Sequence, residues 1–225
     1  MAEQLARLGT GIIEAIGAID APGHERIKAT CGDYFASFSG SWFDRLARHD
    51  EPNRITADDL VAVSMLSTPI DPHAGAWMLG DGAEEVGQLL AQIPPDARLW
   101  EVDEDVLEDD APLSQLWHLL QEGCWPAKKP SNGVGAVTAG KLLAAKRPLL
   151  VPIYDDFIET RLQPPRGQFW KAMRNQLLAS EDRLLIAIAV GSVHDDGPDH
   201  PELSLLRRID IAVWKTEWDA RHRQT

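Results

Sequence analysis

Two glycines and the residues that follow them are the part of this sequence best suited to bind an anion. Gly133 and Gly135 flank one apolar residue, a spacing that allows a tight turn and close approach of the backbone to a partner. The next residues, 136–146, have the composition of a helix, so its first amide groups and the positive end of its dipole would face the same partner. The hydroxyl of Thr138, in the first turn of this helix, adds a hydrogen-bond donor. We therefore predict a phosphate contact made by Gly133, Val134, Gly135, Ala136 and Thr138.

Basic residues gather around this turn. They are Lys128, Lys129, Lys141, Lys146 and Arg147. Binding to nucleic acid requires cations that displace the counterions held by phosphate. We therefore expect Lys141, Lys146 and Arg147 to extend the phosphate contact along a DNA backbone.

A carboxylate follows the turn at a spacing that has a known parallel. The stretch Asn132-Gly-Val-Gly-Ala-Val-Thr-Ala139, with Leu142-Leu143 and Val151-Pro-Ile-Tyr-Asp155, resembles the hairpin and aspartate loop of the helix-hairpin-helix DNA glycosylase superfamily. In that superfamily the catalytic aspartate follows the second glycine at a distance similar to the 20 residues that separate Gly135 from Asp155 here. The same Gly-Val-Gly to Tyr-Asp core also resembles a bacterial family of unknown function.

The resemblance implies DNA binding and, if the chain is an enzyme, a monofunctional glycosylase without lyase activity. In that case Asp155 would stabilise positive charge that develops on the sugar and would orient an attacking water. Val137 stands where lyase-competent members carry a Schiff-base lysine, and Phe157 stands where a histidine often follows the aspartate. The two cysteines are too few for the iron-sulfur cluster of some members, and no cofactor is expected.

The residues also fit two other classes of protein. In one, a non-catalytic helix-hairpin-helix protein docks nucleic acid or another protein, and Asp155 only caps the next helix. In the other, an acidic interaction or regulatory module uses residues 101–110, which carry seven acids in ten residues. Residues 194–200 have the side chains of a divalent-metal loop, but their Gly-Pro pair and charge density describe an exposed connection equally well, and no metal is expected.

The overall charge opposes nucleic-acid binding, but its distribution softens that objection. The chain carries a net charge of −13, of which residues 1–130 contribute −14 and residues 131–225 contribute +1.

No window approaches the roughly 18 apolar residues of a membrane-spanning helix, and the first residues lack the basic flank of a signal peptide. With only Cys31 and Cys124, a disulfide framework is excluded. We expect a cytoplasmic protein with DNA and no membrane as its partner.

Apolar residues three and four apart predict helices through most of the chain. The expected segments are 5–19, 24–38, a start at Ser41, a helix capped by Thr56, 72–79, 83–92, 113–121, 136–146, 156–162, 168–178 and 201–214. Trp42 should face inward and His118 should be packed beside Trp117. Residues 184–193 are apolar without a clear period, and we favour a helix over a buried strand because no partner strand is evident.

These elements predict an all-α fold, or nearly so. Two helical lobes would pack around a cleft, with the helix-hairpin-helix element at its rim. Residues 1–225 would form this single two-lobed domain, residues 101–110 a solvated acidic connector, and residues 112–164 the helix-hairpin-helix and aspartate loop.

Overall fold

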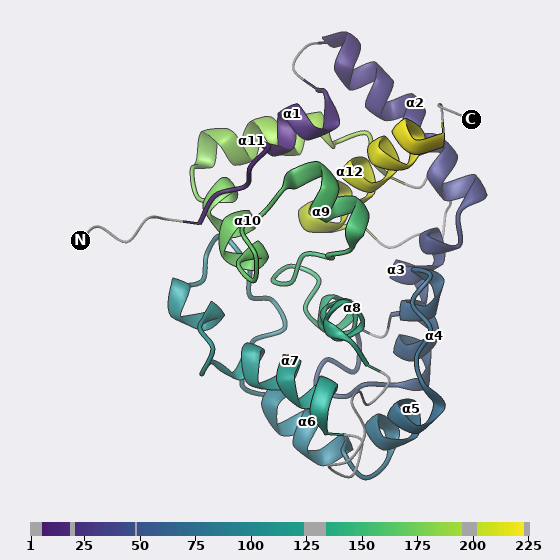
Figure 1. Ribbon diagram of the computed structural model, residues 1–225, viewed down its shortest axis with the longest axis vertical. Helices are drawn as coiled ribbons and strands as arrows, with labels where there is room; N and C mark the ends of the chain where they lie inside the picture. The colour runs from purple at the N-terminus through teal and green to yellow at the C-terminus, as the bar shows by residue number, and fades with distance from the viewer. Residues whose placement is uncertain (1–5, 19–20, 48, 124–133, 195–201, 223–225) are drawn as a thin grey trace. The chain divides into compact units, whose positions relative to one another are not determined.

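The computed structural model describes residues 6–18, 21–47, 49–123, 134–194 and 202–222. Within these ranges the chain forms twelve α-helices and two 3-10 helices, with no strand (Figure 1). The predicted all-α class is therefore confirmed. None of the helices in these ranges has both the length and the apolar character needed to cross a membrane.

The chain divides into two compact units. Unit 1 comprises Met1–Phe38, Leu99–Glu101 and Pro152–Thr225, and unit 2 comprises Ser39–Arg98 and Val102–Val151. One boundary falls inside the predicted acidic connector and another inside the predicted segment 112–164. Two lobes around a cleft and a helix-hairpin-helix element stay predictions, and each unit is described by itself.

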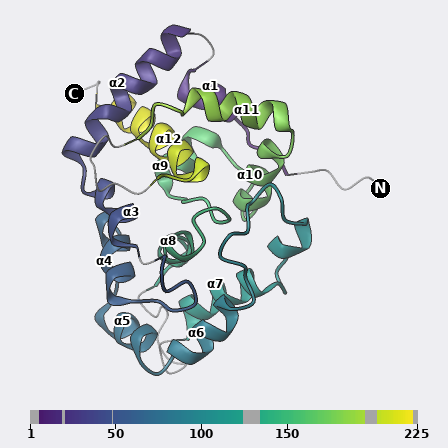
Figure 2. The same ribbon diagram turned by 180° about the vertical axis from the view of Figure 1, so that it is seen from behind.

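Unit 2 is built around one helix, α8. Its elements are η1 (Ser39–Trp42), α3 (Phe43–Leu46), α4 (Ala57–Met65), α5 (Pro72–Leu79), α6 (Ala83–Leu90), η2 (Glu104–Leu107), α7 (Pro112–Glu122) and α8 (Ala136–Lys146). Helix α8 packs against α4 and α7 and lies between them in both views (Figures 1 and 2). Every residue of α8 from Thr138 to Lys146 is buried, including the small residues Ala139, Gly140, Ala144 and Ala145.

Local capping explains where several of these helices begin. The Thr56 side chain accepts a hydrogen bond from the backbone amide of Asp59, and the Asp59 carboxylate accepts one from the amide of Thr56. This capping box confirms the predicted start of α4. Within the acidic run, Glu104–Leu107 form η2, which packs against α7 and buries Leu107, while most of the acids are exposed.

Unit 1 is built around α12 (Leu205–His222), the longest helix of the fold. Its other elements are α1 (Ile12–Ile16), α2 (Ala21–Ser37), α9 (Asp156–Leu162), α10 (Phe169–Leu177) and α11 (Ser180–Ala189). Helix α12 packs against α1, α2 and α9, while α11 packs against α1 and α10. Aromatic rings meet along α12: Phe38 directly follows α2, Phe157 is on α9, and Trp214 and Trp218 are on α12 itself.

Several helix bounds match the predictions from sequence. Helices α5, α8 and α9 have the predicted bounds, and the ambiguous apolar segment is the helix α11. The predicted N-terminal helix is shortened to α1, because the chain is extended at Gly11 and left-handed at Gly17, with φ of 66°. Trp42 was expected to face inward but is 50% exposed, and the Arg45 guanidinium lies 4.6 Å from the centre of its ring.

Candidate nucleic-acid interface

The start of α8 presents backbone donors at the surface. Gly135 is the N-cap in an extended conformation, and it makes no side-chain capping hydrogen bond. The first bond within the helix runs from the Ala139 amide to the Gly135 carbonyl at 2.9 Å, so the three amides before it have no acceptor inside the helix. The side chains of Ala136 and Val137 are exposed. The first turn thus combines exposed residues with backbone amides that have no acceptor in the helix, at the positive end of the helix dipole.

The other residues predicted for the phosphate contact lie in different environments. Val134 is 2% exposed and anchors the start of α8 in the core. The Thr138 side chain is only 8% exposed, so its hydroxyl does not face solvent as the predicted donor would. Gly133 lies outside the described residues. The part of the predicted contact that is exposed thus consists of Gly135, Ala136 and the backbone of the first turn.

An aromatic pair on α7 lies beside this helix start. The indole N–H of Trp117 donates a hydrogen bond of 3.1 Å to the carbonyl of Ala136. The rings of Trp117 and His118 meet edge to face, with their centres 4.9 Å apart. His118 was expected to be packed, but its side chain is exposed. Sequence analysis missed this pair as part of the site, because only the α7–α8 packing brings it to the start of α8.

The three predicted cations of α8 point into unit 2. The Lys141 ammonium group donates to the carbonyl of Leu66 at 3.1 Å and to the hydroxyl of Thr68 at 2.8 Å. The Lys146 ammonium group forms an ion pair of 2.9 Å with Asp59, and both side chains are at most 1% exposed. The expected basic surface is therefore absent at these two positions. DNA contact by either side chain stays a prediction that requires it first to leave its partners.

Arg147 is the most deeply enclosed of the three cations, with no exposed surface. Its guanidinium donates at 2.5–3.0 Å to the backbone carbonyls of Pro52, Leu90, Ile93 and Lys146 and to the side-chain oxygen of Asn53. Burial lowers the pKa of Arg147 from 12.5 to about 10, so the group is still charged at neutral pH. Because Leu90 ends α6, this cation neutralises the carbonyl end of that helix.

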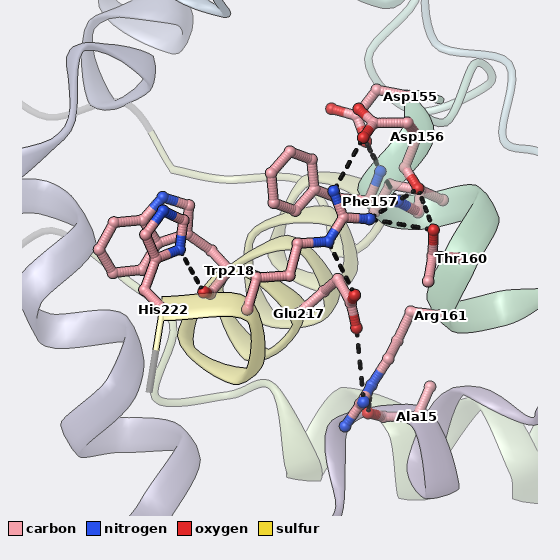
Figure 3. Close-up of polar contacts among 11 residues, drawn as sticks. Ala15, Asp155, Asp156, Phe157, Thr160, Arg161, Glu217, Trp218 and His222 are labelled. Atoms are coloured by element: carbon pink, nitrogen blue, oxygen red, sulfur yellow. Dashed lines mark hydrogen bonds and ion pairs between the residues drawn. The ribbon is translucent and has the colours of Figure 1, made fainter. Parts of the chain in front are cut away.

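Asp155 caps α9, as the non-catalytic interpretation predicts. One carboxylate oxygen accepts hydrogen bonds from the amides of Phe157 and Ile158, each at 3.1 Å. Its side chain is half-buried, and Figure 3 shows it beside Asp156 at the start of α9. Burial raises the pKa of the neighbouring Tyr154, and the Glu159 and Asp155 carboxylates raise it further. A catalytic role is compatible with this cap, because a carboxylate that accepts backbone hydrogen bonds can still carry the negative charge that the catalytic role requires.

A second group of charges surrounds Asp156 in unit 1. The Arg221 guanidinium binds the Asp156 carboxylate at 2.9 Å, the Thr160 hydroxyl at 3.0 Å and the Glu217 carboxylate at 2.9 Å. It also covers the Phe157 ring, 4.1 Å from its centre. These hydrogen bonds, first to Asp156 and then to Glu217, raise the pKa of Arg221.

Glu217 extends this group to α1. Its second oxygen lies 3.5 Å from Arg161, whose Nε donates at 2.7 Å to the carbonyl of Ala15 (Figure 3). The group therefore ties α1, α9 and α12 together. Sequence analysis did not find it, because Asp156 and Arg221 are 65 positions apart.

Comparison with known proteins gives one family match. A model described as a family of unknown function (DUF6308) matches residues 27–217. Neither a curated protein nor a solved structure matches the chain. The family match confirms the predicted relation to a family of unknown function, but it gives no link to the helix-hairpin-helix glycosylases and no activity.

Proposed function

The chain belongs to the DUF6308 family, and we propose that it is a DNA-binding protein that contacts the sugar-phosphate backbone through the start of α8. The observation that carries this proposal is the uncapped, exposed first turn of an eleven-residue helix that is otherwise buried. Buried surroundings hold the helix in place, so its amides are oriented before the phosphate arrives. The exposed His118 imidazole beside Trp117 supplies a further N–H donor in either protonation state.

The burial of Lys141, Lys146 and Arg147 determines what kind of binding to expect. With these charges engaged inside unit 2, the backbone amides of α8 provide the main contact, and few counterions are released from the DNA. The net charge of −13 adds a general repulsion. The proposal therefore expects weak binding and a shallow dependence on salt, with a slope of about −1 to −2 in log affinity against log salt concentration.

The test uses a substitution that suits the helix but repels phosphate. Ala136 is the first residue of α8 and is exposed, and an acid at this position favours helix formation. Ala136→Glu should weaken binding to a labelled DNA duplex by about tenfold, measured by fluorescence anisotropy at about 50 and 200 mM salt. The matched control is Ser180→Glu, which makes the same charge change at the exposed first residue of α11. Equal binding by both variants would rule out the start of α8 as the contact.

A second candidate function is that of a monofunctional glycosylase with Asp155 as its carboxylate. The position of Asp155 at the head of α9, half-buried and 20 residues after Gly135, favours this candidate. Asp155→Asn separates the two roles, because asparagine caps helices as well as aspartate but carries no charge. Single-turnover base release from lesion-containing duplexes should be lost in this variant while its unfolding free energy changes by only a few tenths of a kcal/mol. Base release that persists in Asp155→Asn excludes the catalytic role.

A further inference from the structure

Helix α11 is apolar on two opposite faces, and the described part of unit 1 covers one of them. Ile186, Ala189 and Val190 are at most 1% exposed, on the side where α11 packs against α1 and α10. Leu184 and Leu185 are 61% and 58% exposed on the other side. Helices that are apolar all round are normally covered all round. The apolar segment that begins at Leu184 therefore contains more apolar side chains than the packing of α11 in unit 1 buries.

The exposed face of α11 concentrates apolar surface. We call Leu184, Leu185 and Ile188 the α11 stripe; these side chains are 56–61% exposed. The other large apolar side chains exposed in the described ranges belong to five different elements or their caps: Trp42, Val61, Leu79, Val137 and Leu178. Scattered residues of this kind are ordinary, whereas a continuous patch marks an interaction surface.

The stripe has an acidic border at the start of α11. Glu181 and Asp182 are exposed in the first turn. Glu101 is exposed next to Trp100, whose ring centre lies 5.5 Å from the guanidinium of Arg183. That guanidinium donates to the carbonyls of Leu177 and Leu178, at 2.7 and 3.3 Å, so it is directed back to its own backbone.

We propose that the α11 stripe is a docking site for one amphipathic, basic α-helix of another protein. Leucine-type anchors on such a helix would pack along the stripe, and its basic flanks would meet Glu181 and Asp182. The size fits one helix, because α11 has ten residues and is therefore about 15 Å long.

A second copy of the chain fits this surface less well. A stable dimer needs about 800 Å² from each partner, more than one short stripe supplies. It would also bring together two chains that each carry a net charge of −13. The proposal is independent of DNA binding, since α11 belongs to unit 1 and the start of α8 to unit 2.

The probe for the test is a fluorescein-labelled peptide of about 18 residues, or five helical turns, made of leucine and lysine with all leucines on one face. A peptide of the same composition in scrambled order is its control. The full chain should bind the amphipathic peptide saturably, and Leu185→Glu/Ile188→Glu should weaken that binding at least about tenfold. Because this variant gains negative charge, weaker binding of a basic peptide cannot come from electrostatics. Val61→Glu/Leu79→Glu makes the same charge change at exposed apolar residues of unit 2 and should leave binding unweakened.

Replacing the acidic border tests the charge of the partner. Glu181→Gln/Asp182→Gln should weaken binding several-fold and reduce its salt dependence, with circular dichroism as the check on folding. The proposal is overturned if neither peptide binds, if the scrambled peptide binds equally, or if Leu185→Glu/Ile188→Glu has no effect. It is also overturned if light scattering finds a dimer that this variant converts to a monomer, since the stripe then holds a second copy.

Discussion

Two groups of basic side chains, one in each unit, differ in how deeply they are buried. In unit 2, Lys146 and Arg147 are buried and bind a carboxylate and a set of carbonyl oxygens. In unit 1, the Arg221 side chain is 35% exposed and binds two carboxylates and the face of Phe157. Solvent screens the second group and hardly reaches the first, so similar hydrogen bonds should differ greatly in their effect on stability. A basic segment in a sequence is therefore not evidence of a basic surface.

The largest effect is expected from Arg147→Met. Removal of the guanidinium leaves several buried carbonyl oxygens without a donor, each at a cost of about 1–3 kcal/mol. We expect a loss of about 5 kcal/mol in the unfolding free energy, measured by urea denaturation, which approaches the whole stability of many domains. Arg54→Met is the matched control, because Arg54 lies in the same unit, 63% exposed, in a 3.8 Å pair with Glu51. If the two variants lose the same stability, burial is not what distinguishes these cations.

Lys146→Met should cost about 3 kcal/mol, because the buried Asp59 carboxylate loses the ammonium group that lies 2.9 Å from it. Asp59→Asn, added to this variant, removes the buried negative charge and keeps an oxygen that can accept the hydrogen bonds of Thr56. The double variant should therefore recover part of the lost stability in the same denaturation experiment. If the double variant is less stable than Lys146→Met, the loss of the ion pair is not the cause of the destabilisation, and a loss of side-chain packing is.

Sequence predicted best those features that depend on neighbouring residues. The caps at Thr56 and Asp155 act over two or three residues: the sequence predicts the first, and it offers the second as one of two roles for Asp155. The direction of Lys146 was not predicted, because its partner Asp59 lies 87 positions away and only the packing of α4 on α8 brings them together. The exposed face of α11 was missed for a related reason: apolar periodicity identifies which residues can be buried, but not whether a neighbour covers them.

Asp155→Ala gives a smaller effect, because the cap it removes stabilises only the start of α9. The amides of Phe157 and Ile158 lose their acceptor, and the loss of a helix N-cap typically costs about 1 kcal/mol, which is the loss that we expect. Asp155→Asn should lose only a few tenths of a kcal/mol. Thermal denaturation followed by circular dichroism compares the two variants. If both variants lose the same large amount of stability, the negative charge of Asp155, and not its capping hydrogen bonds, stabilises the start of α9.

The smallest loss of stability is expected when Arg221 is substituted, and the most informative measurement is how this loss changes with salt concentration. Arg221→Ala should cost under about 1 kcal/mol at low salt, and the portion due to Asp156 and Glu217 should fall as salt screens the half-exposed pairs. The contact with the Phe157 ring should persist, because it depends less on long-range charge. Arg221→Lys keeps the charge but loses the planar group that covers the ring, so the difference between the two variants isolates that contact. A salt-independent loss as large as that of Lys146→Met would mean that the exposure of these cations does not determine their effect on stability, and that Arg221 supports unit 1 as Arg147 supports unit 2.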